Sequence, residues 1–217
     1  MVPTSFAESG NSPQQLKDGL WVFPPNINCN GNRSWWLGCQ PESVLIDCPP
    51  VNKSTIALLQ TLSSGNSARI ILTSREAHGR VAELQKELGW PVLVQEQEAY
   101  LLPGLNDLGT FSEEHLTKSG LRLLWTPGPT PGSCVVHAPS PWNVLFCGRL
   151  LIPMKLNRLV AFRTRRTFHW TRQQKSLEKL RKWLPENPRP SLASGAGIQS
   201  AGGGKLVEWE GWKDPSE

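Results

Sequence analysis

A chain of 217 residues can bury one good hydrophobic core but leaves little room for a second full domain. Hydrophobic residues make up only 38% of it, and 19 glycines and 19 prolines predict many turns and loops. The sequence has no run of about 18 apolar residues, which excludes a membrane-spanning helix. Residues 1–15 lack the basic and apolar regions of a secretory signal.

The charge balance and the cysteines further limit the class of protein that this chain can be. Lys and Arg total 23 against 18 Asp and Glu, a formal net charge of +5 that is compatible with anionic partners but does not require them. The five cysteines form no Cys-x-x-Cys pair and no zinc-knuckle spacing. An odd number of cysteines without a secretory signal favours reduced thiols. We therefore expect a soluble, cytoplasmic protein.

The first half of the chain alternates strand and helix patterns. Residues 1–17 are rich in Ser, Pro, Gln and Asn and are expected to be disordered. Ser54 is a suitable N-cap for a helix that ends at Leu62. Val81, Leu84 and Leu88 recur on one face of a second predicted helix, 78–88, which Gly89 ends. Strands are predicted at 20–23, 35–37, 44–46, 69–72 and 91–94, and the alternation is typical of a layered α/β domain.

The second half predicts another group of strands and one long helix. Glu96 and Glu98 lie on a predicted helical turn at i and i+2, so they do not face each other, and we expect a solvated face. A helix over 171–184 places three leucines, 177, 180 and 184, on one face. Strands are predicted at 121–125, 134–137, 144–147 and 206–209. The resulting division is a disordered segment 1–17, one domain 18–210 and a C-terminal tail 211–217.

Residues 155–175 are the most basic part of the chain. They combine seven basic residues with three aromatic ones, a composition that suits phosphate contacts and base stacking. More often such a run is the solvated face of a loop and helix, and no RNA-binding motif is present. The residues are Lys155, Arg158, Arg163, Arg165, Arg166, Arg172 and Lys175, with Phe162, Phe168 and Trp170.

Several stretches together resemble the motifs of the metallo-β-lactamase superfamily. Residues 126–133, Thr-Pro-Gly-Pro-Thr-Pro-Gly-Ser, are similar to Thr-Pro-Gly-His-Thr-Pro-Gly-Ser of that superfamily. Residues 45–49 (Leu-Ile-Asp-Cys-Pro) resemble Leu-Ile-Asp-Thr-Gly, and residues 144–149 (Val-Leu-Phe-Cys-Gly-Arg) resemble Val-Leu-Phe-Thr-Gly-Asp. Residues 73–78 resemble Thr-His-x-His-x-Asp-His with the ligand positions changed, and residues 194–197 resemble Pro-Gly-His-Gly more faintly. The resemblance covers residues 18–200 and implies a single-domain, four-layer αββα sandwich.

The same resemblance implies where metal ligands would lie and shows that most are replaced. The matched positions carry Ser74, Glu76, Ala77, His78, Pro129, Arg149 and Ala196. A catalytic zinc needs about three protein ligands, and only His78 and Glu76 could serve. Arg149 replaces the bridging aspartate, so a positive charge stands where the cations would lie. We therefore expect neither zinc nor iron, no metal ligands and no catalytic residues.

Two hypotheses describe what occupies this vestigial site, formed by Ser74, Arg75, Glu76, His78 and Arg149. In the first, Arg149 pairs with Glu76, and an internal ion pair replaces the metal cluster. In the second, Arg149, Arg75 and the N–H groups at the start of the predicted helix 78–88 bind an anion. Asp47 is expected either to brace the site from behind, as the resemblance implies, or only to terminate its strand.

Three functions remain open from the sequence. The first is a binding or regulatory protein with a dismantled metal site, inactive as a metallohydrolase, whose partner is a small anionic ligand or a protein. The second is a hydrolase with His78 as base and Glu76 as its orienter, although no nucleophile elbow surrounds Ser74. The third is a nucleic-acid-binding relative of the RNA-processing members of the superfamily, acting through residues 155–175.

Overall fold

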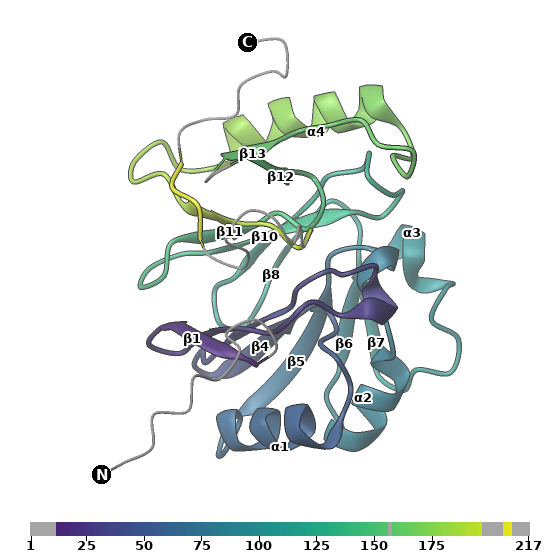
Figure 1. Cartoon of the computed structure of the whole chain (residues 1–217), viewed down its shortest axis with the longest axis vertical. Coiled ribbons are helices and arrows are strands. Elements are labelled where there is room, and N and C mark those ends of the chain that lie inside the picture. Colours follow the sequence, from purple (N-terminus) through teal and green to yellow (C-terminus); the bar gives the residue numbers. More distant parts are fainter. Residues whose placement is uncertain (1–11, 156–157, 197–205, 210–217) are drawn as a thin grey trace.

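The computed structural model describes residues 12–155, 158–196 and 206–209, and it has four layers (Figure 1). The helices α1 (Lys53–Leu62) and α2 (Val81–Leu88) cover one sheet, and α4 (Trp170–Trp183) covers the other. The two sheets face each other in the middle of the molecule. The predicted αββα sandwich in a single domain is confirmed.

The first sheet has seven strands that follow each other in chain order. Its first four strands pair antiparallel, whereas β4 to β7 run parallel. Its strands are β1 (Gln14–Lys17), β2 (Leu20–Val22), β3 (Trp35–Leu37), β4 (Glu42–Ile46), β5 (Ser67–Leu72), β6 (Val92–Gln95) and β7 (Leu108–Phe111). Because the parallel strands end at one edge of the sheet, the loops that follow them meet there.

The second sheet has five strands in the order β14-β11-β10-β9-β8. Its members are β8 (Glu114–Leu116), β9 (Arg122–Trp125), β10 (Cys134–Ala138), β11 (Val144–Phe146) and β14 (Ser191–Ala193). A separate hairpin joins β12 (Ile152–Lys155) to β13 (Arg158–Val160). The short helical elements are η1 (Ile27–Cys29), η2 (Arg75–Ala77) and α3 (Glu96–Ala99).

The alternation of side chains along the strands divides the core into layers. Trp35 points between the sheets and contacts Phe146, with ring centroids 5.5 Å apart. Its neighbour Trp36 points to the opposite face, toward α1 and α2, where its ring lies 5.5 Å from that of Trp90. This period-2 alternation buries both faces of the first sheet. Two of the ten tryptophans, neighbours on β3, are therefore core residues on opposite faces of the first sheet.

Helix α4 closes the outer face of the second sheet through its leucines. Leu177, Leu180 and Leu184 are all buried, and they belong to the same cluster as Leu145 and Leu192 of β11 and β14. The predicted apolar face of this helix is confirmed. The helix begins after His169, whose Nδ1 accepts a hydrogen bond from the Arg172 backbone N–H at 3.3 Å.

Three local expectations were wrong. Residues 14–17 were expected to be disordered but form β1, because their backbone pairs with β2. The second helix begins at Val81 rather than 78, because residues 75–77 form the 3-10 helix η2. Glu98 was expected on a solvated face but is buried, and its Oε1 accepts a hydrogen bond from the Gly132 N–H at 3.0 Å.

The two ends of the chain are described only in part. The predicted strand 206–209 is reduced to a single bridge between Val207 and Leu192. The tail 211–217 and residues 1–11 lie outside the described residues. Within the described ranges, none of the helices has the length and apolar character needed to cross a membrane.

The N-cap of α1 also differs from expectation. Asn52, not Ser54, caps the helix: its side chain accepts a hydrogen bond from the Thr55 backbone N–H at 2.9 Å. Ser54 lies inside the helix, and its hydroxyl donates to Asn52 Oδ1 at 2.6 Å. Both residue types can cap a helix, and the backbone position decides between them.

Alanine substitutions should therefore distinguish the capping residue, Asn52, from Ser54 by their effects on stability. Asn52→Ala is expected to lower the free energy of unfolding by about 1 kcal/mol, because it leaves a helix-end N–H unsatisfied. Ser54→Ala should cost less than about 0.5 kcal/mol, because it removes only an exposed contact. Urea unfolding of both variants measures the difference. A Ser54→Ala cost equal to that of Asn52→Ala would contradict the assignment.

Candidate functional site

Asp47 ties the ends of two neighbouring strands together at the loop edge. It follows β4 with a positive φ of 63°, and its carboxylate accepts hydrogen bonds from Thr73 N–H at 2.7 Å and Thr73 Oγ1 at 2.8 Å. Thr73 directly follows β5, so Asp47 fixes the point at which η2 begins. Asp47 both terminates its own strand and braces the loop that carries Glu76.

Gly148 allows the second sheet to approach this pair closely. Its φ is +50°, and a Cβ atom there would lie 2.9 Å from Thr73 Oγ1. Any larger residue would therefore clash with the hydroxyl that Asp47 holds, and the positive φ would strain it as well. This close approach brings the next residue, Arg149, which follows β11 of the second sheet, next to the loop that follows β5.

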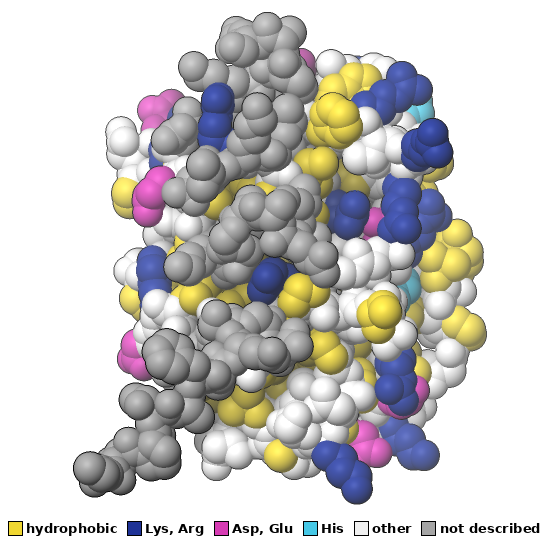
Figure 2. All heavy atoms as spheres, in the orientation of Figure 1, with side chains coloured by type: hydrophobic (Ala, Val, Ile, Leu, Met, Phe, Trp, Pro, Cys, Tyr) yellow, Lys and Arg dark blue, Asp and Glu magenta, His cyan; other side chains and the backbone are white. Residues whose placement is uncertain are grey.

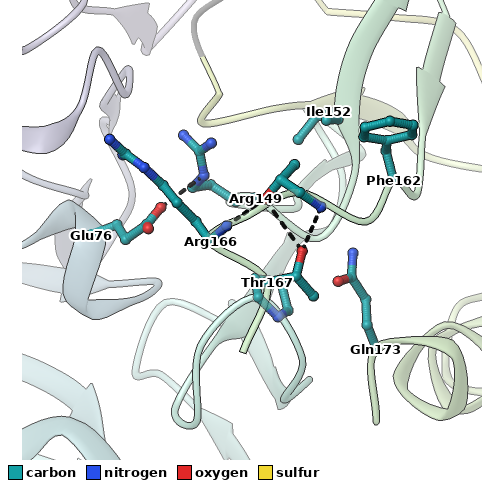
Figure 3. Close-up of a pocket in the computed structure, with 9 residues that line it drawn as sticks. Glu76, Arg149, Ile152, Phe162, Arg166, Thr167 and Gln173 are labelled. Carbon is teal, nitrogen blue, oxygen red and sulfur yellow. Dashed lines mark hydrogen bonds and ion pairs between the residues drawn. The ribbon is translucent and has the colours of Figure 1, made fainter. Parts of the chain in front are cut away.

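Arg149 and Glu76 form an ion pair between the two sheets (Figure 3). Arg149 Nε lies 2.8 Å from Glu76 Oε2, and the two side chains are 19% and 15% exposed. Asn32 completes the arrangement: its Oδ1 accepts from Arg149 Nη1 at 2.9 Å, and its Nδ2 donates to the Glu76 carbonyl at 3.4 Å. The predicted ion pair is confirmed.

His78 and Ser74 lie in the same loop but have few polar contacts. Among the described residues, neither Ser74 Oγ nor His78 Nε2 has a hydrogen-bond partner. Burial and, less strongly, the nearby charge of Arg75 together lower the pKa of His78 to about 4. His78 is therefore neutral at pH 7.

The predicted anion pocket is not assembled as proposed. Arg75 is exposed and does not line the cavity beside Arg149. The helix whose N–H groups were to complete the pocket starts three residues later than expected, at Val81. Among the side chains of the five vestigial residues, only those of Glu76 and Arg149 are in direct polar contact.

The remaining matched positions offer no side-chain donors. Ala77 and Ala196 are buried, and Pro129 lines the cavity next to Arg149. Within the described ranges, no three His, Cys, Asp or Glu side chains are grouped so that they could hold a metal ion. The two carboxylates nearest the site, Asp47 and Glu76, already have partners in Thr73 and Arg149.

The cavity at the site is small. Its volume is about 10 Å³, which is room for about one water molecule. The lining includes residues that were not predicted: Thr164, Thr167 and Gln173, and with them Arg166 of the basic segment. Gln173 is buried, donates from Nε2 to the Leu150 carbonyl at 3.1 Å, and leaves Oε1 without a partner among the described residues. No sequence motif indicated Gln173 or Asn32.

The buried Asp47 should make stability depend on pH. Burial raises the pKa of Asp47 to about 7, while the hydrogen bonds from Thr73 lower it in part. The folded protein therefore binds a proton that the unfolded chain has released between about pH 4 and 7, so this group's contribution to stability falls as pH rises. The lowered pKa of His78 has the opposite effect: its contribution to stability rises with pH between about pH 4 and 6.5.

Asp47→Asn keeps the acceptor for the Thr73 N–H but removes the titration. Relative to the parent protein, the variant should gain stability between pH 4.5 and pH 7, by up to about 3 kcal/mol. The stability of the variant should itself rise with pH over this range, because the contribution of His78 to the pH dependence is no longer opposed by Asp47. Urea unfolding at the two pH values tests this, with His78→Gln as the converse control. A pH dependence unchanged by Asp47→Asn would refute the assignment.

Comparison with known proteins supports the fold through structure alone. Neither protein-family models nor curated protein sequences show a significant match. Among solved structures, DIM-1 metallo-β-lactamase is similar with a TM-score of 0.65 and 13% identity, over 90% of this chain and 90% of that one. The archaeal metallo-β-lactamase superfamily protein ST1585 from Sulfolobus tokodaii gives a TM-score of 0.56 and 15% identity, over 76% and 74%.

A third structure, TTHA1623 in a di-iron-bound form, gives a TM-score of 0.58 and 21% identity, over 77% of this chain and 88% of that one. The resemblance seen in the sequence motifs is thereby confirmed at the level of the fold. This chain has the metallo-β-lactamase fold.

Proposed function

We propose that this protein is a binding or regulatory protein in which the Glu76–Arg149 ion pair takes the place of the metal cluster, and that it is not an active metallohydrolase. The observation that carries the proposal is the 2.8 Å contact between Arg149 Nε and Glu76 Oε2. Arg149 stands where the resemblance implies a bridging aspartate. The ion pair therefore occupies the place where the superfamily holds its cations.

Electrostatics support this proposal. At an effective dielectric constant of about 20, two unit charges about 4 Å apart interact by about 4 kcal/mol, and a divalent ion doubles this. A cation beside Arg149 would meet that repulsion and would compete with Arg149 for the carboxylate of Glu76. Ala77, Pro129 and Ala196 offer no compensating donors. Without a bound metal there is no activated water for hydrolysis.

The di-iron form of TTHA1623 shows that a structure with this fold holds two iron ions. The backbone arrangement alone therefore does not prevent metal binding. The difference proposed here lies in the side chains: those at the matched positions of this chain supply one neutral imidazole and one carboxylate already paired with Arg149.

The alternative hydrolase receives less support from the geometry. Glu76 pairs with Arg149, and His78 Nε2 has no hydrogen-bond partner among the described residues, so no contact with Glu76 orients that nitrogen. A histidine with a pKa of about 4 is a weak general base at neutral pH. Within the described ranges, Ser74 Oγ makes no hydrogen bond to His78 or to any other base.

Metal content tests the proposal. The purified full chain should carry less than about a tenth of a zinc or iron ion, since at most two donors remain where about three are needed. A variant that restores the superfamily pattern should bind metal. It carries Ser74→His, Glu76→His, Ala77→Asp, Pro129→His, Arg149→Asp and Ala196→His. Elemental analysis of both proteins measures the zinc and iron bound per chain, with the single variant Arg149→Asp as control. Stoichiometric metal in the parent protein would refute the proposal.

A double-mutant cycle tests the ion pair itself. Arg149→Met should destabilise the fold by about 1–3 kcal/mol, because it leaves Glu76 and Asn32 with unpaired buried acceptors. Arg149→Met combined with Glu76→Gln should cost less than the sum of the single changes, with a coupling of about 1 kcal/mol or more.

The exposed pair Lys179–Glu113 provides the matched control for this cycle. Its side chains are 41% and 61% exposed, and the separation of Nζ and Oε2 is 2.6 Å. The same cycle there should give a coupling well below about 1 kcal/mol, because solvent screens exposed charges. Equal coupling in the two cycles would mean that the Glu76–Arg149 pair is only a surface contact.

A further inference from the structure

One stretch of the chain, from Arg158 to Lys175, combines exposed cations with exposed aromatic rings. We call it the basic-aromatic rim and define it by eight residues, all exposed: Arg158, Phe162, Arg163, Arg165, Arg166, Phe168, Arg172 and Lys175. Phe162 is 45% exposed and Phe168 is 48% exposed. The segment 158–177 contains no Asp or Glu, and the next acidic residue after it is Glu178 of α4.

The cations of the rim are also without acidic partners in space. Other exposed cations pair with carboxylates, Arg80 with Glu83 and Lys179 with Glu113. In the part of the chain that the structure describes, no ion pair joins a rim cation to an acid. Six like charges on one short segment repel one another, and an anionic partner would remove that cost.

The loop that carries the rim is held in one conformation by its own hydrogen bonds. Thr167 Oγ1 accepts from Thr164 N–H at 2.9 Å, and Thr164 Oγ1 accepts from Arg166 N–H at 3.2 Å. The Phe168 N–H donates to the Pro129 carbonyl at 3.1 Å. These contacts restrain the backbone that presents Arg165, Arg166 and Phe168, which lowers the entropy cost of binding.

The rim borders the cavity at the ion pair. Phe162 and Arg166 line that cavity together with Arg149 and Glu76 (Figure 3). Figure 2 shows Lys and Arg side chains gathered beside hydrophobic ones at the upper right of the molecule. A partner on the rim would thus pass over the edge where the loops of both sheets meet.

We propose that the basic-aromatic rim binds single-stranded nucleic acid. Arginine forks bind phosphate oxygens, and exposed phenylalanine rings stack on unpaired bases, which present their faces only in a single strand. Phe162 and Phe168 flank Arg163, Arg165 and Arg166 in the sequence, which places stacking groups on both sides of the phosphate-binding ones. The proposal names the partner of the binding role proposed above and rests on that role, but it does not require the site to be free of metal.

Two other polyanions fit the rim less well. A duplex offers phosphates but keeps its base faces stacked inside, so it would leave both phenylalanines without a partner. An anionic membrane favours a contiguous apolar face beside the cations, whereas the rim has two separated rings among six charges. Both are outcomes that the experiment distinguishes.

Fluorescence anisotropy on the full chain tests the proposal, with a labelled 15-nucleotide single-stranded RNA of mixed sequence as probe. We expect binding in the presence of EDTA that weakens with salt, with a log–log slope of about −0.7 for each phosphate neutralised. The matching duplex and vesicles of phosphatidylcholine with phosphatidylserine should compete at least about tenfold less well.

Two double variants separate the two kinds of contact. Arg163→Glu/Arg165→Glu should weaken binding at least about tenfold and make the salt slope shallower by about 1.4. Phe162→Ala/Phe168→Ala should weaken binding about tenfold or more and leave the slope unchanged, because stacking releases no counterions. Lys53→Glu/Lys86→Glu changes the net charge equally on the exposed faces of α1 and α2 and should stay within about threefold of the parent.

Three results would overturn the proposal: no binding at low salt, preference for duplex or vesicles, or equal losses in the rim and control variants. Metal content measured on the same preparations keeps the two proposals apart. Stoichiometric metal would refute the ion-pair proposal, whereas the EDTA titrations report on the rim alone.

Discussion

The contact between Glu76 and Arg149 is the constraint on which the functional edge of this molecule depends. Glu76 follows a strand of the first sheet, and Arg149 follows a strand of the second, so their ion pair spans the seam between the two halves. Asn32 bonds to both residues and brings in the loop between β2 and β3. The ion pair therefore links loops that follow strands of both sheets.

Polar groups beneath the pair set its geometry. Asp47 holds Thr73, and Gly148 leaves just enough room for the hydroxyl of Thr73. The carboxylate is fully buried, and burial rather than a neighbouring charge raises its pKa. Hydrogen bonds between Asp47 and Thr73 therefore position the start of the loop that carries Glu76.

The sequence predicted the layers well and the site only in part. The motif at 126–133 and the leucine face of α4 indicated the fold, because both are local patterns. The ion pair followed from two charges at matched positions. The partners that complete it did not: Asn32 lies 117 positions from Arg149, and no local pattern indicates such a contact. The burial of Glu98 was missed for the same reason, since Gly132 of a distant loop covers it. Helix starts at 52–54 and 78–81 were misplaced because neighbouring residues offered equally good local signals.

The most direct test of the central claim is a crystal structure of the full chain grown with excess zinc, with an anomalous difference map recorded at the zinc edge. The account predicts no anomalous peak beside residue 149 and an intact contact between Arg149 Nε and Glu76 Oε2. A strong peak coordinated by His78 and Glu76, with the guanidinium of Arg149 turned away, would contradict it.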